Sequence, residues 1–483
     1  MSSIAQIYEL EFKNLLKEKL SGLINDISDN LIQNILKPDD LKYVKILSNL
    51  EENIKALILK ILAETIHFFN EKFTNSKERK KFYHINVRND HRSITTAIGH
   101  LEFFRTYFES KDRKEHFYFI DELLGIDKYA RYDCNSKANA ISLATKTNQK
   151  LAGELVLQNT FSSNLNNIPR QTINRWIKQW KVPIIQYDPI NINGDTLYIM
   201  ADEKWIHEQI YGRKEEDNGK HKFIMSKEFV CFSGIEQMKN RRILKDRFVF
   251  ITSSSSTWND FLDTVSKIYD FEKLEKIVFL SDAGKWLISG APDLKLFSHN
   301  KVIMCLCEFH VRQKVNRITT NQEYRDKLNQ AIDENKKKVF KSLMTEIKEL
   351  KKDNPIRLEK LTEYENYILN HWKKIKNMAD SPCKSSMESH ISHYIASYFS
   401  SRPKAYSRNT IENHLKLQEA KINGIDIKSL FLKSYKNYST LTFNQKELDF
   451  SIFENSSSSN IPVFQNGHIT SLFSTLSSLV HLS

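Results

Sequence analysis

The feature that most constrains the fold is a series of short apolar segments between residues 195 and 310. Three come first, then an amphipathic segment, "TWNDFLDTVSKIY", and then two more that are separated by a short helical stretch. In chain order the five apolar segments are "DTLYIMAD", "HKFIMSKEFVCFSG", "RFVFITSSSS", "KIVFLSDAG" and "KVIMCLCEFH". Apolar runs bounded by turns predict the strands of a sheet that is buried on both faces.

The order of these segments predicts the class of sheet. Three meandering strands followed by helix, strand, short helix, strand and helix is the order of an RNase H-like core. Gly and Pro are few, 12 and 9 of 483 residues, which favours a helix-rich protein with short connections. We therefore expect a multidomain, helix-rich α/β protein whose RNase H-like mixed sheet is built from 191–310 and 383–420, with a helical insertion at 311–382.

Two acidic residues, Asp202 and Asp282, stand where an apolar segment ends. Reacting groups gather at strand ends in α/β sheets, and neighbouring strands would bring both carboxylates to one edge. Adjacent carboxylates repel each other unless a cation or proton joins them, and Mg²⁺ or Mn²⁺ prefers carboxylate oxygens. Two such ions can serve an in-line phosphoryl displacement. The alternative is that each Asp only caps the helix that follows it.

A third acid is expected on an element that packs beside the sheet. Glu388, at the start of a late helix, is the candidate. Glu203, Glu308 and Asp293 compete with it for this place. Glu203 would point away from Asp202, because successive side chains of a strand alternate between its faces.

Cys307 and His310 form a Cys-x-x-His pair at the end of the last apolar segment. Half of a zinc site is one interpretation, but the sequence shows no second half. A structural histidine is another. The third is a histidine that reaches the scissile phosphate or orients a carboxylate.

The charge of the chain indicates a polyanionic partner. The net charge is +13 at pH 7, and a basic protein of this size most often meets nucleic acid or an acidic membrane surface. No apolar run approaches the roughly 18 residues that span a bilayer, and the N-terminus lacks the pattern of a signal peptide. The five cysteines are odd in number and scattered, which fits a reducing compartment.

The first two regions of the chain differ in pattern. Residues 1–78 have helical apolar spacing and predict packed helices, with a coiled-coil dimerisation arm as the alternative. Residues 79–119 are basic, and "SITTAI", Gly99-His100 and "LEFFRTYF" predict a β-hairpin. The candidate phosphate contacts on this hairpin are Arg88, Arg92 and Arg105.

Residues 120–190 return to a helical pattern that contains "IPRQTINRWIKQW". Pro169 suits the first turn of a helix, and one face of that helix would carry Ile173, Trp176, Ile177 and Trp180. The opposite face would carry Arg170, Gln171, Asn174, Arg175 and Lys178. Long cations suit phosphates and amides suit base edges, so we prefer a DNA-binding helix-turn-helix to an ordinary amphipathic helix.

The last third of the chain begins with a charged helical region. Residues 311–378 hold 17 basic and 10 acidic residues, which predicts either a solvated helical face or an insertion that lies along DNA. Residues 421–483 contain "SSSS" and little apolar patterning, so they predict a peripheral C-terminal extension.

Six stretches, taken in this order, resemble bacterial insertion-sequence transposases of the ISLre type, which belong with the Mutator-like DDE transposases. They are "RSITTAIGHLEFFRTYF", "DELLGIDKYARY", "LYIMADEKWIHEQ", "VFLSDAGKWL", "CEFHVRQKV" and "MESHISHYIASYFSSRP". The resemblance implies an RNase H-like core with an Asp-Asp-Glu triad, which falls on Asp202, Asp282 and Glu388. Cys307 and His310 match the family's Cys/Asp-x-x-His motif.

The resemblance also implies a function. It implies a transposase that uses two Mg²⁺ or Mn²⁺ ions to cleave the terminal inverted repeats of its element and to join the freed 3′-hydroxyl to target DNA. Such a protein would work as a homodimer or higher oligomer, in the bacterial cytoplasm at the nucleoid, without a membrane partner. After the second strand the family more often has Asp-Gly-Ala, whereas this chain has Asp282-Ala283-Gly284. Gly284 would let the chain turn, and Lys285 would face a phosphate.

Two other functions remain open on sequence alone. One is an RNase H-like nuclease that cuts DNA without joining it. The other is a DNA-binding derivative that uses residues 149–180 and has lost catalysis.

Overall fold

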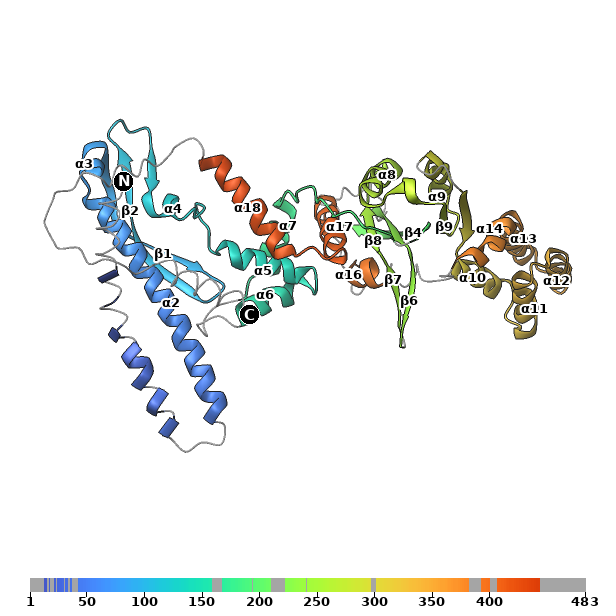
Figure 1. Ribbon diagram of the computed structural model, residues 1–483, viewed down its shortest axis with the longest axis horizontal. Helices are drawn as coiled ribbons and strands as arrows, with labels where there is room; N and C mark the ends of the chain where they lie inside the picture. The colour runs from blue at the N-terminus through green and yellow to red at the C-terminus, as the bar shows by residue number, and fades with distance from the viewer. Residues whose placement is uncertain are drawn as a thin grey trace. The chain divides into compact units, whose positions relative to one another are not determined.

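The computed structural model describes residues 42–158, 167–192, 194–209, 222–239, 241–296, 301–381, 392–399 and 406–443, with short stretches between residues 13 and 36. The chain forms two compact units. The first contains residues up to 93 and residues 101–130, and the second contains 94–100 and 131–442. Figure 1 shows the elements of both.

The first unit packs a long helix against a three-stranded sheet of order β1-β2-β3. Asn70 on the helix exchanges two hydrogen bonds with Thr106 of the sheet, at 3.0 and 3.1 Å. The expected hairpin is present as neighbouring strands. The elements are α2 (Lys42–Asn75), α3 (Lys77–Phe82), β1 (Tyr83–Thr95), β2 (His100–Ser110), β3 (His116–Tyr118) and α4 (Phe119–Leu123).

Two of the three arginines expected to contact phosphate form buried ion pairs within the protein instead, so that prediction was wrong for them. Arg92 and Arg105 are both buried, and both form ion pairs with Asp121. Arg105 also pairs with Asp90 at 3.0 Å. Arg88 remains exposed. The buried guanidinium groups hold the sheet to the segment after it.

The second unit is built on a mixed five-stranded sheet of order β10-β9-β4-β5-β8. The pairs β10–β9 and β9–β4 are parallel, and the pairs β4–β5 and β5–β8 are antiparallel. This agrees with the five predicted strands and their chain order. The strands are β4 (Thr196–Glu208), β5 (Lys222–Phe232), β8 (Phe248–Thr252), β9 (Lys276–Ser281) and β10 (Lys301–Leu306).

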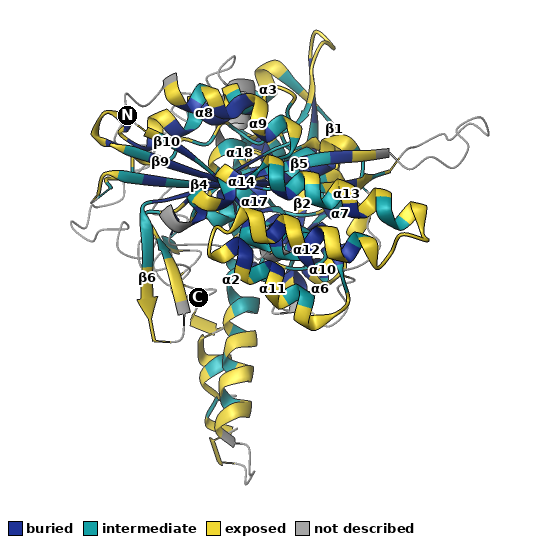
Figure 2. Cartoon of the chain, turned by 90° about the vertical axis from the view of Figure 1, so that its right-hand side faces the viewer, coloured by how far each residue is buried: buried dark blue, intermediate teal, exposed yellow. Residues whose placement is uncertain are grey.

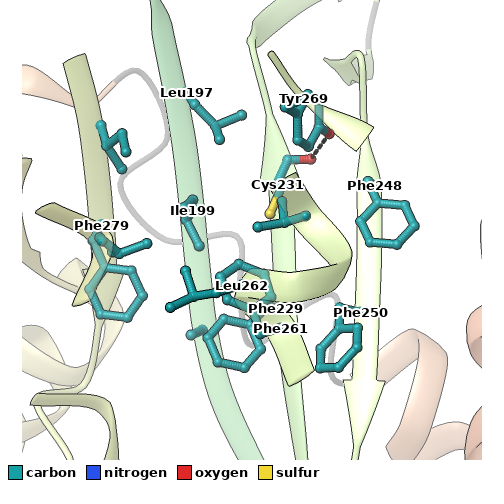
Figure 3. Packing of buried hydrophobic residues seen from close by; sticks show 14 of the residues in the cluster. Leu197, Ile199, Phe229, Cys231, Phe248, Phe250, Phe261, Leu262, Tyr269 and Phe279 are labelled. Atoms are coloured by element: carbon teal, nitrogen blue, oxygen red, sulfur yellow. Dashed lines mark hydrogen bonds between the residues drawn. The ribbon is translucent and has the colours of Figure 1, made fainter. Parts of the chain in front are cut away.

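Helices cover both faces of this sheet, as the apolar strands predicted. One face packs against α8 (Thr257–Ile268) and α9 (Lys285–Gly290), with Phe229 stacked on Phe261 at 4.0 Å (Figure 3). Side chains from η5 (Ser392–Ala396), α16 (Ser397–Phe399) and α17 (Arg408–Ile422) pack on the other face. The central strands are accordingly buried along most of their length (Figure 2).

A two-stranded ribbon interrupts the predicted order. It is formed by β6 (Gly234–Met238) and β7 (Arg241–Lys245), between β5 and β8, and much of it is exposed. Its sequence, "GIEQMKNRRILK", has too few apolar residues to have been recognised as a hairpin.

The predicted helical insertion is present and begins directly after β10. Its own core contains Phe340 and Trp372, whose ring centroids are 5.6 Å apart. Asn377 donates to the carbonyl of Met304 at 2.9 Å and so covers the outer edge of β10. The helices are α10 (Glu308–Ile318), α11 (Gln322–Asp333), α12 (Lys337–Glu349), α13 (Pro355–Asn370), α14 (Trp372–Lys376) and η4 (Asn377–Asp380).

Three helices before the sheet share a core with two after it. These are α5 (Cys134–Ala144), α6 (Gln149–Gln158), α7 (Arg170–Gln179), α17 and α18 (Ile427–Phe443). The expectation of a peripheral extension after 421 was therefore wrong for its first part. Ile427 and Phe431, four residues apart on α18, are buried in this core, and Trp180 donates to Ser434 at 3.0 Å.

The other outer strand, β8, is closed by polar side chains of α17. Asn423 accepts from the amide of Val249 at 2.9 Å and donates to its carbonyl at 2.7 Å. The Glu419 carboxyl accepts from the amide of Ile251 and from the hydroxyl of Tyr187, both at 2.8 Å. These groups occupy the positions that a further strand would take.

We expect Glu419→Gln to flatten the dependence of stability on pH. Burial raises the pKa of Glu419 from 4.5 to about 7, so the folded state favours the protonated acid. Its stabilisation is complete below the unfolded pKa and is lost as the pH rises through the folded value. Urea denaturation at about pH 5 and pH 8 measures how much the free energy of unfolding falls between these two pH values. This fall should be some 3 kcal/mol larger in the wild type than in the variant. Equal losses would contradict this assignment.

No helix within the described ranges combines the length and the apolarity needed to cross a bilayer.

Candidate active site

Asp202 lies inside a strand rather than at its end. The sequence had placed the end of the strand here, but β4 continues to Glu208 and stays paired with β5 throughout. What ends near Asp202 is the pairing with β9, whose last partners are Met200 and Leu280. The prediction of a strand end was wrong because β4 extends beyond the end of its pairing with β9 and continues beside β5.

The same register places the second acid beside the first. Asp202 and Asp282 each lie two residues beyond the last pair of the parallel strands β4 and β9. The carboxyl ends of parallel strands meet at one edge of a sheet. Asp202 is buried and Asp282 is half-buried, so the pair stands partly out of water.

The turn after β9 is held by Asp282 itself. Its carboxylate accepts from the amide of Gly284 at 2.8 Å. The residue in the left-handed region is Ala283, with φ of 66°, whereas Gly284 has a φ of −54°. The expectation that Gly284 provides the turn was therefore wrong. The order Asp-Gly-Ala would put glycine where this backbone needs it.

We expect Ala283→Gly to stabilise the protein. An L-residue in the left-handed region is strained, and relief should raise the free energy of unfolding by about 0.5–1 kcal/mol, measured by urea denaturation. Gly284→Ala is the matched control, because its φ suits any residue but its Cβ would lie 3.2 Å from the Asp282 carboxylate. The control should gain no stability. A destabilised Ala283→Gly variant would show that the turn differs from the one described.

His310 joins the two acids. It lies in the first turn of α10, and one ligand atom each from Asp202, Asp282 and His310 lie within 4.8 Å of one another. Cys307 precedes α10 and is buried, and burial raises the pKa of its thiol to about 11. A raised pKa lowers the fraction of thiolate, which is the form of cysteine that binds metals.

The helical insertion supports the Asp282 turn. Tyr367, on α13, donates its hydroxyl to the backbone carbonyl of Asp282 at 2.7 Å, and Ala283 packs against the core of the insertion. His371, at the end of α13, has its pKa lowered mainly by burial, with the Asp282 charge acting in the opposite direction. Sequence reasoning did not connect these residues with the site.

A fourth acid was missed altogether. Glu228 on β5 is the direct partner of Asp202 in the antiparallel register and is completely buried. Burial, and then the charge of Asp202, raises the pKa of Glu228 to about 8. A lone acid inside the apolar segment "KEFVCF" was the available signal.

Two of the three competing acids have other partners. The Glu203 carboxylate accepts from the indole of Trp286, and Glu308 pairs with Arg312 at 3.0 Å. Glu388 lies outside the described residues, so its position relative to the two aspartates is not part of the geometry. The segment that follows it, η5 and α16, packs on the face of the sheet to which Asp202 and Glu228 belong.

The site fits a divalent cation by the chemistry of its donors. Ligands at about 2.1 Å from one ion lie no more than about 4.2 Å apart, so small rotations would bring Asp202, Asp282 and His310 onto it. Carboxylates favour Mg²⁺ or Mn²⁺, and an imidazole ligand favours Mn²⁺ of these two.

The candidate DNA contacts on α7 differ in exposure. Ile173 and Ile177 are buried, as predicted for the apolar face. Arg170, Gln171, Arg175 and Lys178 are exposed, whereas Asn174 is half-buried with its carbonyl oxygen out of solvent. Residues 159–166, the connection of the expected helix-turn-helix, lie outside the described residues. Lys285 is exposed at the start of α9.

These features define a helix-rich α/β protein with a carboxylate and histidine site at one edge of a mixed sheet. The chain belongs to the uncharacterised protein family UPF0236, which matches residues 39–434. It is 25% identical over 462 residues to a UPF0236 protein of Caldanaerobacter subterraneus subsp. tengcongensis, covering 91% of this chain and 93% of the relative.

Two further relatives match over a smaller share of the chain. A second UPF0236 protein of that organism is 25% identical over 427 residues, covering 85% of this chain and 86% of the relative. The UPF0236 protein in the vanSb 3′ region of Streptococcus gallolyticus is 23% identical over 346 residues, covering 70% and 73%. The first relative is named for eleven loci of its genome and the second for four, so the family occurs there in many copies.

Proposed function

We propose that this protein is the DNA transposase of an insertion sequence, with an RNase H-like core and a metal-dependent Asp-Asp-Glu site. The observation that carries the proposal is the convergence of Asp202, Asp282 and His310 within 4.8 Å. The strand order supports the RNase H-like assignment, because three antiparallel strands are continued by two parallel ones. The many loci of the relatives support a mobile element.

The chain's own residues divide the work at this site. Asp202 and Asp282 would hold the Mg²⁺ or Mn²⁺ ions, with Glu388 as the proposed third acid. Such a cation, when bound, lowers the pKa of the attacking water or hydroxyl and neutralises phosphate charge. His310 is close enough to both carboxylates to orient one of them or to move a proton to a leaving oxygen. Lys285 is exposed beside the turn and would contact a neighbouring phosphate.

DNA binding is proposed for the exposed face of α7. The net charge of +13 provides the non-specific attraction, and Arg170, Gln171, Arg175 and Lys178 are available to phosphates and base edges. Two element ends must be cut together, so we propose a dimer or a higher oligomer in the DNA complex.

The test is strand transfer with a labelled duplex that carries the inverted repeat flanking the gene. With Mg²⁺ or Mn²⁺ we expect cleavage that leaves a 3′-hydroxyl, followed by products joined to a second duplex. Cleavage without joined products would favour the nuclease. Specific binding without cleavage would favour the DNA-binding derivative.

A further inference from the structure

Two neighbouring inward positions of β5 carry polar side chains between apolar ones. Ser226 and Glu228 alternate with Ile224 and Val230 along the strand, and all four belong to the face covered by η5, α16 and α17. Both polar residues are 0% exposed. A side chain can be buried this completely without cost only if its polar atoms are satisfied.

Neither of these side chains is satisfied by the described part of the chain. Both carboxylate oxygens of Glu228 and the hydroxyl of Ser226 lack a hydrogen-bond partner there. Two groups near Glu228 interact with it electrostatically. They are the carboxylate of Asp202 and, from the covering segment, the hydroxyl group of Tyr394. A completely buried acid whose oxygens have no hydrogen-bond partner in the described part of the chain is unusual, and it is most simply explained by an ion or solvent bound in the functional state.

The register shows where such an ion would sit. Residues directly opposite on antiparallel strands have Cβ atoms about 4.5–5.5 Å apart and share one face. Glu228 therefore lies next to Asp202 on the side of β5, whereas Asp282 and His310 lie on the side of β9 and β10. Asp202 stands between the two groups.

We propose that Glu228, in addition to the acids named above, is a ligand of a second divalent cation, and that Asp202 is shared between this cation and the one held with Asp282 beside His310. The proposal rests on the proposed function and assigns the two ions to different sides of Asp202. It predicts that the binding of each ion can be abolished separately by a substitution. Ser226, beside Glu228, would contribute a hydroxyl or hold a water of the second ion.

The test is the stoichiometry of Mn²⁺ binding to the full chain, measured by equilibrium dialysis and by the electron paramagnetic resonance signal of free Mn²⁺. The wild type should bind two ions. Glu228→Gln should bind one, with at least tenfold weaker binding of the other, and Asp282→Asn should lose the other position. Glu203→Gln is the matched control, because Glu203 neighbours Asp202 but binds Trp286, and it should keep both ions.

Thermal melts with and without Mn²⁺ confirm that each variant is folded, and Glu228→Met, of similar length and apolar, replaces the Gln variant if that one unfolds. Two bound ions in Glu228→Gln or Glu228→Met would overturn the proposal. A wild type that binds one ion, lost in Asp282→Asn and kept without Glu228, would overturn it while leaving the proposed function intact. A wild type that binds no Mn²⁺ would overturn both.

Discussion

Asp282→Asn should abolish strand transfer, with a loss of at least about 1,000-fold, because it would remove one of the carboxylates proposed to hold the cation. Charge stabilisation by a bound metal is worth several kcal/mol in the transition state, and each 1.4 kcal/mol is a factor of ten in rate. The substitution should leave the turn in place. An asparagine carbonyl can still accept from the amide of Gly284, as the Asp282 carboxylate does at 2.8 Å.

The measurement is the initial rate of joined product with the labelled element end, at saturating Mg²⁺ and again with Mn²⁺. Asp263→Asn is the matched control, since Asp263 lies on α8 of the same unit, is exposed and forms an ion pair with Lys267 on its own helix. The control should join ends at the wild-type rate. An Asp282→Asn variant within tenfold of the wild type would show that catalysis lies elsewhere.

The sheet could be predicted because its burial leaves a simple trace in the sequence. Strands covered on both faces must be apolar at every position, so they appear as unbroken runs such as "KIVFL". The end of β4 could not be predicted in this way. Beyond Asp202 the strand has β5 on one side but has lost β9 on the other, so its residues become polar while the backbone stays extended.

The site was only partly visible in the sequence for a related reason. Asp202 and Asp282 each follow an apolar run, and strand order predicts that the two runs are neighbours in the sheet. Glu228 has no such position: the lone acid in "KEFVCF" is a weak signal, because the sequence does not tell whether that acid points inward or lies on an exposed edge. Which of Ala283 and Gly284 takes the positive φ depends on the packing of the turn against Leu287 and the insertion, and this is a tertiary property.

Phe229→Ala should be the most destabilising of the substitutions considered, by about 3–5 kcal/mol in free energy of unfolding. Phe229 is 0% exposed, stacks on Phe261 at 4.0 Å and meets Trp258 and Trp286 edge-on at 5.2 and 5.8 Å. Removing the ring would leave a cavity between β5 and α8, where Figure 3 shows Phe229 packed beside Phe261. These aromatic neighbours are large and rigid, so they cannot close it.

Phe223→Ala is the control for this cavity. Phe223 lies on the same strand but is exposed, so its truncation should cost about 1 kcal/mol or less in the same urea titration. The comparison also tests the faces of β5, because Phe229 and Glu228 are adjacent and must point to opposite sides of the sheet. If Phe229→Ala lost Mn²⁺ at full stability, the aromatic ring would belong to the metal face and the register with Asp202 would be wrong. If it lost stability and kept both ions, the carboxylates would lie on the face opposite the aromatic core.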